Sequence, residues 1–266
     1  MISTKHVIER ILQKIAAPSR PDTVDGLIAG SLEANVTGIA TAMMATFDVL
    51  QRAVAAKHNL VITHEPTFYL HQETRDSLPD DSVSRRKQEF IRTQNLNIFH
   101  FHDHWHDRQP DGIEIGMIQA LGWAQYADTR RLNLFHVPEM TLASFARKLA
   151  SQLGIQTMRV VGSPNLPVRR VLASWGFLSR DNGMSLLARP DVDALVAGET
   201  HEWEVVEYAQ DMVAMGQNKA LILLGHVLSE QAGMAYCAEW LKSFISEIPI
   251  DFIPISEPYW NPRDIL

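Results

Sequence analysis

The sequence predicts an α/β fold of two lobes with mixed, mostly parallel sheets. Short apolar segments alternate with longer amphipathic segments along the chain, which is typical of strands alternating with helices. The 266 residues, of which 46% are hydrophobic, suffice to bury the core of one large domain or two small ones. No run of about 18 apolar residues is present, and the first 17 residues mix charged with aliphatic side chains. We therefore expect a cytoplasmic protein without a membrane-spanning helix.

The first half of the chain predicts a βαβα order. An amphipathic helix comes first, since Val7, Ile11 and Ile15 recur at helical spacing, and it is expected to end before Pro18. Buried strands are expected at GIATAMM (38–44), LVIT (60–63) and LNIFHFH (96–102). Two further helices are expected between these strands, at FDVLQRAVAAKHN (47–59) and at residues 82–94. This alternation indicates parallel strands covered by helices.

The second half of the chain repeats this alternation. Helices are expected at LASFARKLASQLG (142–154), WEVVEYAQDMV (203–213) and EQAGMAYCAEWLKSFI (230–245). Strands are expected at MRVVG (158–162), VRRVLASWG (168–176), DALVAGE (193–199), KALILLGH (219–226) and IDFIPI (250–255). The predicted lobes are residues 1–128 and 129–266. The final strand belongs either to the second lobe or, by returning, to the first.

Charge and cysteine content exclude several classes of site. The net charge of −7 comes without a basic block, so neither a nucleic-acid surface nor an anionic-membrane surface is indicated. The single Cys237 cannot form an intramolecular disulfide, which agrees with a reducing compartment, and it excludes a Cys-rich zinc site. Any metal ion must therefore be bound by His, Asp and Glu side chains.

Polar side chains follow three of the expected strands. They are His64 with Glu65, Asp103 with Asp107, and His226 with Glu230. Ligands of open α/β sheets bind beyond the carboxyl ends of the strands, so these side chains could converge. Such donors suit divalent ions such as Zn, Mn, Fe, Co or Mg, and five or six of them are too many for one tetrahedral ion. A pair of ions about 3.5 to 4 Å apart, bridged by a carboxylate, would use them all.

The segment HFHDHWHD (100–107) holds four histidines at alternate positions. An extended chain would place all four on one face, and not all of them can be ligands. We interpret His100 and His102 as packing within the sheet, and His104 and His106 as loop residues. Asp107, which lies beyond the strand end, is the preferred ligand of this segment.

His226 and the segment GETHEWE (198–204) each leave two interpretations open. His226 either binds a metal ion together with Glu230 or completes a turn, in which case the glutamate favours the N-terminus of the next helix. In GETHEWE, Glu199 and His201 either face the same site or begin an acidic helix.

Several motifs, in order along nearly the whole chain, resemble one known family. They are VDGLIAG (24–30), LVITHEP (60–66), DHWHD (103–107), VPEMTLASFARKLASQLGI (137–155), ALVAGETHEWE (194–204) and ALILLGHVLSE (220–230). On these segments the sequence resembles the NGG-interacting-factor-three-like family, dinuclear-metal proteins that are also known as type-two GTP cyclohydrolase I homologues. The resemblance implies two α/β lobes with two divalent metal ions in the cleft between them, assembled into a toroidal homohexamer.

The resemblance also implies roles for individual residues. The metal ligands would be His64, Glu65, Asp107, His226 and Glu230. Glu230 would bridge the ions, Glu65 stands where the family usually has a second histidine, and Asp103 replaces a family histidine near the site. The hard oxygen donor of Glu65 should favour Mn, Mg or Fe(II) over Zn at that position. The identity of the ions, among Zn, Mn, Fe and Mg, stays open.

These observations predict a dinuclear divalent-metal-dependent hydrolase. Its substrate would be a small molecule, either a nucleotide, as for a GTP cyclohydrolase, or another phosphorylated compound, attacked by a metal-activated water. Glu65, Asp103 or His201 would shuttle protons or orient the ligands. The alternative is a non-catalytic metal-binding regulatory or scaffold protein that forms a ring oligomer.

Overall fold

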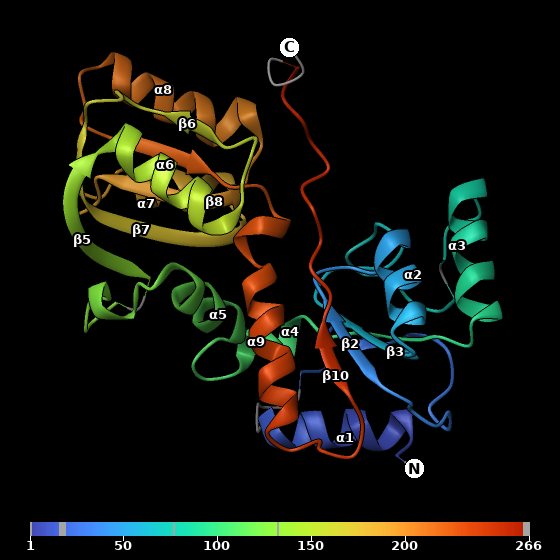
Figure 1. Cartoon of the computed structure of the whole chain (residues 1–266). Coiled ribbons are helices and arrows are strands. Elements are labelled where there is room, and N and C mark those ends of the chain that lie inside the picture. Colours follow the sequence, from blue (N-terminus) through green and yellow to red (C-terminus); the bar gives the residue numbers. More distant parts are fainter. Residues whose placement is uncertain (1, 16–19, 77, 132, 263–266) are drawn as a thin grey trace. The chain divides into compact units, whose positions relative to one another are not determined.

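The computed structural model describes residues 2–15, 20–76, 78–131 and 133–262. It divides into unit 1, which comprises Met1–Gly116 and Gly233–Ile255, and unit 2, which comprises Met117–Ala232 and Ser256–Leu266. The described residues form one five-stranded mixed sheet in each unit (Figure 1). The predicted α/β class with mixed sheets is therefore confirmed. Within these residues, no helix combines the length and the apolarity needed to span a bilayer.

Unit 1 is built on a sheet with the strand order β1, β4, β3, β2, β10. Its strands are β1 (Gly26–Ala29), β2 (Ile39–Ala42), β3 (Leu60–Thr63), β4 (Asn97–His100) and β10 (Ile250–Phe252). Its helices are α1 (Thr4–Ile15), α2 (Phe47–Ala55), α3 (Ser82–Thr93) and α4 (Asp103–Asp107), together with most of α9 (Gln231–Lys242) and the first half of α5 (Gly112–Leu121). The expected end of the first helix before Pro18 falls outside the described residues.

The register of the first sheet brings the ends of β3 and β4 together. The two strands are parallel, and Thr63 lies opposite His100. β2 and β10 are also parallel to them, whereas β1 is antiparallel to β4. Figure 1 shows β10 beside β2, although most of the chain separates them. Because the carboxyl ends of β3 and β4 are level, the residues that follow them lie at one edge of the sheet.

The cores of the two units follow from the strand composition. Every residue of β2, β3, β4 and β9 is buried, which explains the near-continuous apolar segments in the sequence.

Thr46 caps α2 by accepting a hydrogen bond from the Val49 backbone N–H at 3.1 Å. Cys237 is buried in α9, and burial raises the pKa of its thiol, so this cysteine is not a reactive nucleophile.

Unit 2 is built on a sheet with the strand order β5, β7, β8, β9, β6. Its strands are β5 (Leu134–Thr141), β6 (Arg159–Val161), β7 (Pro167–Phe177), β8 (Ala194–Glu199) and β9 (Ala220–Leu223). Its helical segments are η1 (Ala124–Tyr126), α6 (Leu142–Leu153), α7 (Arg180–Leu187), the π-helical η2 (Glu202–Val206), α8 (Glu207–Ala214) and η3 (Val227–Ser229). The three central strands, β7, β8 and β9, are parallel, and the edge strands β5 and β6 are antiparallel to their neighbours.

One local prediction is wrong in a way that matters for the site. The strand was expected to run through His102, with His104 and His106 on a loop, but β4 ends at His100 and residues 103–107 form the helix α4. In a helix, residues four apart share a face, so His102 and His106 come together while His104 lies elsewhere. The elements β1, β5, α5 and α7 were also not predicted from the sequence.

Candidate functional site

A carboxylate from a distant part of the chain holds the N-terminus of α4. Asp25, whose side chain is 3% exposed, precedes β1. Its Oδ1 accepts the backbone N–H groups of His102 at 2.7 Å and Asp103 at 2.8 Å. Its Oδ2 accepts the backbone N–H of His104 at 3.1 Å and lies 2.7 Å from Nδ1 of the same residue. Asp25 thus satisfies backbone donors that a helix start leaves without partners. It was not among the residues selected from the sequence, where its only signal is its place in VDGLIAG.

Trp105 fixes the orientation of α4 from the opposite side. It is fully buried, and its ring centroid lies 5.7 Å from that of Phe101 and 5.1 Å from that of Trp240. Gly112 lies so close that a Cβ atom there would sit 2.1 Å from the indole. With Trp105 pointing into the core of unit 1, the neighbouring residues of the helix point toward the edge where β3 ends.

Three imidazoles meet at this edge and are called here the imidazole cluster: His64, His102 and His106. The ring centroids are 4.5 Å apart for His64 and His102, 4.8 Å for His64 and His106, and 4.9 Å for His102 and His106. One potential ligand atom from each ring lies within 4.8 Å of the other two. The exposed His71 adds a fourth ring, 4.9 Å from His102. The residues of the cluster are therefore close enough to share one metal ion.

Carboxylates lie behind two rings of the cluster. His102 Nδ1 is 3.0 Å from Oδ1 of Asp103, and His106 Nδ1 is 2.8 Å from Oδ2 of Asp111. Burial acts to raise the pKa of Asp103, but hydrogen bonds from His102 and Val24 and the charge of Arg20 outweigh it and hold that pKa below its ordinary value. Asp103 is therefore an anionic acceptor near neutral pH.

The backbone of His64 is held from both sides. Its N–H donates to the Met43 carbonyl at 3.1 Å, and the next N–H, that of Glu65, donates to the same carbonyl at 2.7 Å. His100 Nε2 lies 3.0 Å from the His64 carbonyl oxygen. Burial is the main cause that lowers the pKa of His100, so this imidazole is neutral at pH 7 and donates its Nε2–H to the carbonyl. The position of His64 is thus set by neighbouring β2 and β4 segments.

The loop after Glu65 is pinned by two buried ionisable residues. Glu73, which is 4% exposed, accepts the backbone N–H groups of Thr67 and Phe68, both at 2.6 Å. Lys87 on α3, also 4% exposed, donates from Nζ to the Thr67 carbonyl oxygen. Burial lowers the pKa of Lys87 to about 8, although the charge of Glu73 acts in the opposite direction. These contacts fix the chain that leaves the strand end at His64.

The low pKa of Lys87 predicts a pH dependence of stability. In the unfolded protein the Lys87 amine keeps its proton up to its ordinary pKa of 10.5. In the folded protein it releases the proton near pH 8. The unfolded state therefore binds more protons between these values, and the free energy of unfolding rises as the pH rises through this range. Between pH 7 and pH 9 we expect the free energy of unfolding of the parent to rise by about 1–2 kcal/mol relative to that of Lys87→Met.

Urea denaturation of both proteins at the two pH values measures this difference. Lys242→Met is the matched control, because Lys242 is an exposed helical lysine paired with Glu239. Its pH profile should run parallel to that of the parent. A parallel profile for Lys87→Met as well would show that Lys87 does not titrate anomalously.

Unit 2 carries a second group of ionisable side chains. His226, three residues after the end of β9, has Nδ1 2.9 Å from Oε1 of Glu199 and Nε2 3.2 Å from Oε2 of Glu230. Glu230 is only 4% exposed and packs against Gly176, where a Cβ atom would lie 2.3 Å from its Oε1. Ser229 donates its hydroxyl to the His226 carbonyl at 2.7 Å and accepts the Gly176 N–H at 3.0 Å. Gly176 and Ser229 together hold Glu230 beside His226.

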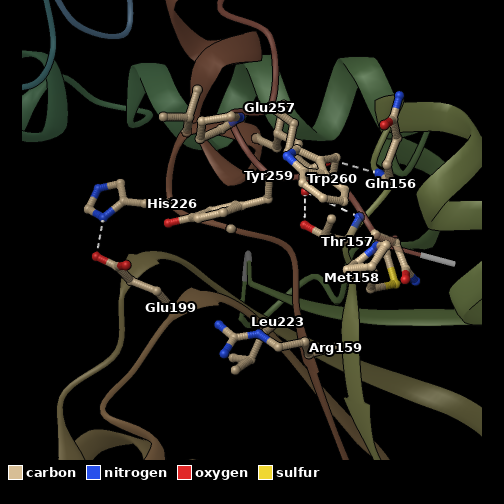
Figure 2. A pocket seen from close by; sticks show the side chains of 16 residues that line it. Gln156, Thr157, Met158, Arg159, Glu199, Leu223, His226, Glu257, Tyr259 and Trp260 are labelled. Atoms are coloured by element: carbon tan, nitrogen blue, oxygen red, sulfur yellow. Dashed lines mark hydrogen bonds and ion pairs between the residues drawn. The ribbon is translucent and has the colours of Figure 1, made fainter. Parts of the chain in front are cut away.

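A pocket of about 660 Å³ opens next to His226 within unit 2. The C-terminal segment forms one wall, and Figure 2 shows Tyr259 extending toward His226. Glu257 anchors this segment by accepting the backbone N–H groups of Gln156 at 2.7 Å and Thr157 at 3.2 Å. Residues Tyr259 and Trp260 are 68% and 62% exposed, so their rings are accessible to a ligand.

The remaining residues selected from the sequence have other neighbours. Arg20 contacts both oxygens of Asp107 at 3.2 Å and lies 3.6 Å from Asp103. His201 stacks on Trp203 with ring centroids 4.7 Å apart. His64 lies directly after β3, where the sequence predicted it. His102 and His106, which were interpreted from the sequence as a sheet residue and a loop residue, lie beside it. The roles of all the selected residues remain predictions.

Comparison with known proteins decides the family. The sequence profile of the family described as Duf34/NIF3 (NGG1p interacting factor 3) matches residues 3–258. The chain belongs to this family. The resemblance inferred from the motifs is thereby confirmed, and the site residues described above are those of a NIF3 family member.

Relatives of this NIF3 family member cover nearly its whole length at low identity. A Clostridium acetobutylicum protein named GTP cyclohydrolase 1 type 2 homolog is 24% identical over 254 residues, which are 91% of this chain and 90% of the relative. A Clostridium perfringens protein of the same name is 23% identical over 264 residues, with 94% and 95% covered. A solved Bacillus cereus protein related to NIF3 has a TM-score of 0.73 at 14% identity and covers 98% of this chain and 99% of its own. At this identity, the solved structure supports the fold alone.

Proposed function

We propose that this protein is a divalent-metal-dependent hydrolase acting on a small-molecule substrate. The observation that carries the proposal is the imidazole cluster, because three histidines with carboxylates behind two of them form a donor set suited to a divalent ion. Bound ions would supply Lewis acidity and lower the pKa of a bound water. The finer part of the proposal, two ions held with the help of Glu65, Asp107, His226 and Glu230, rests on the resemblance to the family.

The protein's own residues would orient the donors and move protons. Glu65 is half-buried directly beside His64, which suits a carboxylate that accepts a proton near the ions. Asp103, anionic near neutral pH, orients His102 through their hydrogen bond. His201 is half exposed and is proposed as a second proton shuttle, 3.3 Å from a carboxylate oxygen of Glu204.

The pocket in unit 2 supports a planar, nucleotide-like substrate. Tyr259 and Trp260 offer accessible ring faces, and stacking on an aromatic side chain favours a heterocyclic base. The pocket volume of about 660 Å³ lies within the range of small-molecule sites. Two relatives are named GTP cyclohydrolase 1 type 2 homolog, which agrees with a nucleotide in this role.

A non-catalytic metal-binding protein is the second candidate. The burial of His64 favours it, because a metal ion bound to a fully buried side chain can serve structure rather than turnover. The ring-shaped homohexamer and the cytoplasmic location predicted from the sequence fit either candidate. Light scattering coupled to size-exclusion chromatography tests the hexamer.

Turnover distinguishes the two candidates. The protein is prepared metal-free, reloaded with Zn, Mn, Fe(II) or Mg, and assayed on a panel of nucleotides and phosphoesters. We expect metal-dependent hydrolysis that falls at least about 100-fold in His64→Ala and Glu230→Ala. Glu239→Ala, at an exposed helical glutamate, should retain the parent rate. Absence of turnover with every metal and substrate would favour the binding protein.

A further inference from the structure

We propose that His102 and His106 are metal ligands together with His64, so that unit 1 holds one ion through three imidazole nitrogens. The inference deepens the proposed function and rests on it for the role of the metal ion. His102 and His106 are absent from the five ligands that the family resemblance implies. They come together because residues 103–107 fold as the helix α4, with His102 directly before it.

The helical geometry of α4 creates the pair. His102 directly precedes the helix and His106 lies four residues later, so the two rings project from one side. Asp25 holds the first turn through three backbone N–H groups, and the buried Trp105 anchors the opposite side. The pair is therefore presented on a fixed support beside His64, as a metal site requires.

The hydrogen bonds at Nδ1 determine which nitrogen can bind a metal. An ionised carboxylate only accepts, so His102 donates its Nδ1–H to Asp103, and His106 donates its Nδ1–H to Asp111. In the neutral tautomer with the proton on Nδ1, the lone pair is on Nε2. Metal-bound histidines usually have this arrangement, with a carboxylate that orients the ring and raises its basicity.

The donor set determines the preferred ion. Three neutral imidazoles form a borderline set that suits Zn, Co, Ni or Fe(II) better than the hard ions Mg and Mn. In addition, the carboxylate of Asp107 is held by Arg20 through contacts of 3.2 Å to both oxygens. The imidazole cluster should therefore outweigh the preference for hard ions that Glu65 alone would give.

Cobalt titration tests the ligand assignment without an activity assay. Metal-free protein is titrated with Co(II), and the ligand-field absorption is followed in the visible range. We expect one tightly bound ion in the parent, with at least about tenfold weaker Co(II) binding in His102→Ala and in His106→Ala. Asp111→Asn should also weaken binding about tenfold, because it removes the anionic acceptor of His106. Mg(II) in large excess should not displace the cobalt.

His136→Ala is the matched control, because His136 in unit 2 is also paired with an aspartate, 3.0 Å from Asp128, but stands outside the cluster. Its Co(II) binding should equal that of the parent. If an alanine variant does not fold, as judged by circular dichroism, His102→Gln and His106→Gln replace it. Parental Co(II) affinity and absorption in the folded variants at both positions would overturn the assignment. Intact, histidine-dependent cobalt binding without turnover would instead refute only the proposed hydrolase.

Discussion

Replacing Asp25 by alanine should destabilise unit 1 by about 3 kcal/mol, because three backbone N–H groups at the start of α4 lose their acceptor. The carboxylate is 3% exposed, so these hydrogen bonds are largely shielded from solvent. His104 loses the partner of its Nδ1 in the same variant. Because α4 carries His102 and His106, Co(II) binding should weaken together with stability. Urea denaturation followed by tryptophan fluorescence measures the first effect.

Asp25→Asn is the conservative control for this prediction. Its amide oxygen can still accept the N–H groups of His102 and Asp103, whereas the amide NH₂ cannot accept the N–H of His104. We expect a loss of stability of about half that in Asp25→Ala. Equal stability of Asp25→Ala and the parent would show that the N-terminus of α4 does not depend on this carboxylate.

Replacing Gly176 by alanine should destabilise unit 2 by about 3 kcal/mol through two effects. Gly176 has a φ of +66°, a left-handed conformation that costs a residue with a side chain about 1–2 kcal/mol. In addition, the new Cβ atom would lie 2.3 Å from Oε1 of Glu230, which is buried beside His226. The carboxylate would have to move, so the geometry of the His226 and Glu230 pair should also be lost.

Gly122→Ala separates the two effects. Gly122 has nearly the same φ, +64°, and a Cβ atom there would meet no atom of another side chain or strand within 4 Å. Chemical denaturation should therefore show only the backbone cost of about 1–2 kcal/mol in this variant. If both alanine variants lose the same stability, the close contact of Gly176 with Glu230 has no energetic importance.

The fold was largely predictable because four of its strands, β2, β3, β4 and β9, are buried along their whole length. LVIT, NIFH and ALIL are short, continuous apolar segments, and each becomes a fully buried strand. The position of His64 followed from the same pattern, since it comes directly after β3. β1 and β5 were missed because the first is only partly buried and the second is interrupted by Pro138 and mostly exposed from that residue on.

The geometry of the site was less predictable, because it depends on contacts between residues far apart in the sequence. The helix α4 begins where it does because Asp25, 77 residues before His102, accepts its first N–H groups. No capping side chain within α4 itself indicates this start. The wall of the pocket in unit 2 likewise depends on Glu257, which binds the backbone of Gln156 across 101 residues. Periodicity and local propensity do not contain such information.

The central claim is that the imidazole cluster binds a metal ion, and anomalous diffraction tests this most directly. Crystals of metal-free protein are soaked in Zn(II), and data are collected on both sides of the zinc absorption edge. We expect an anomalous peak within bonding distance, about 2.0–2.1 Å, of one nitrogen each of His64, His102 and His106. A zinc peak that contacts neither His102 nor His106, or the absence of a peak at His64, would contradict the claim.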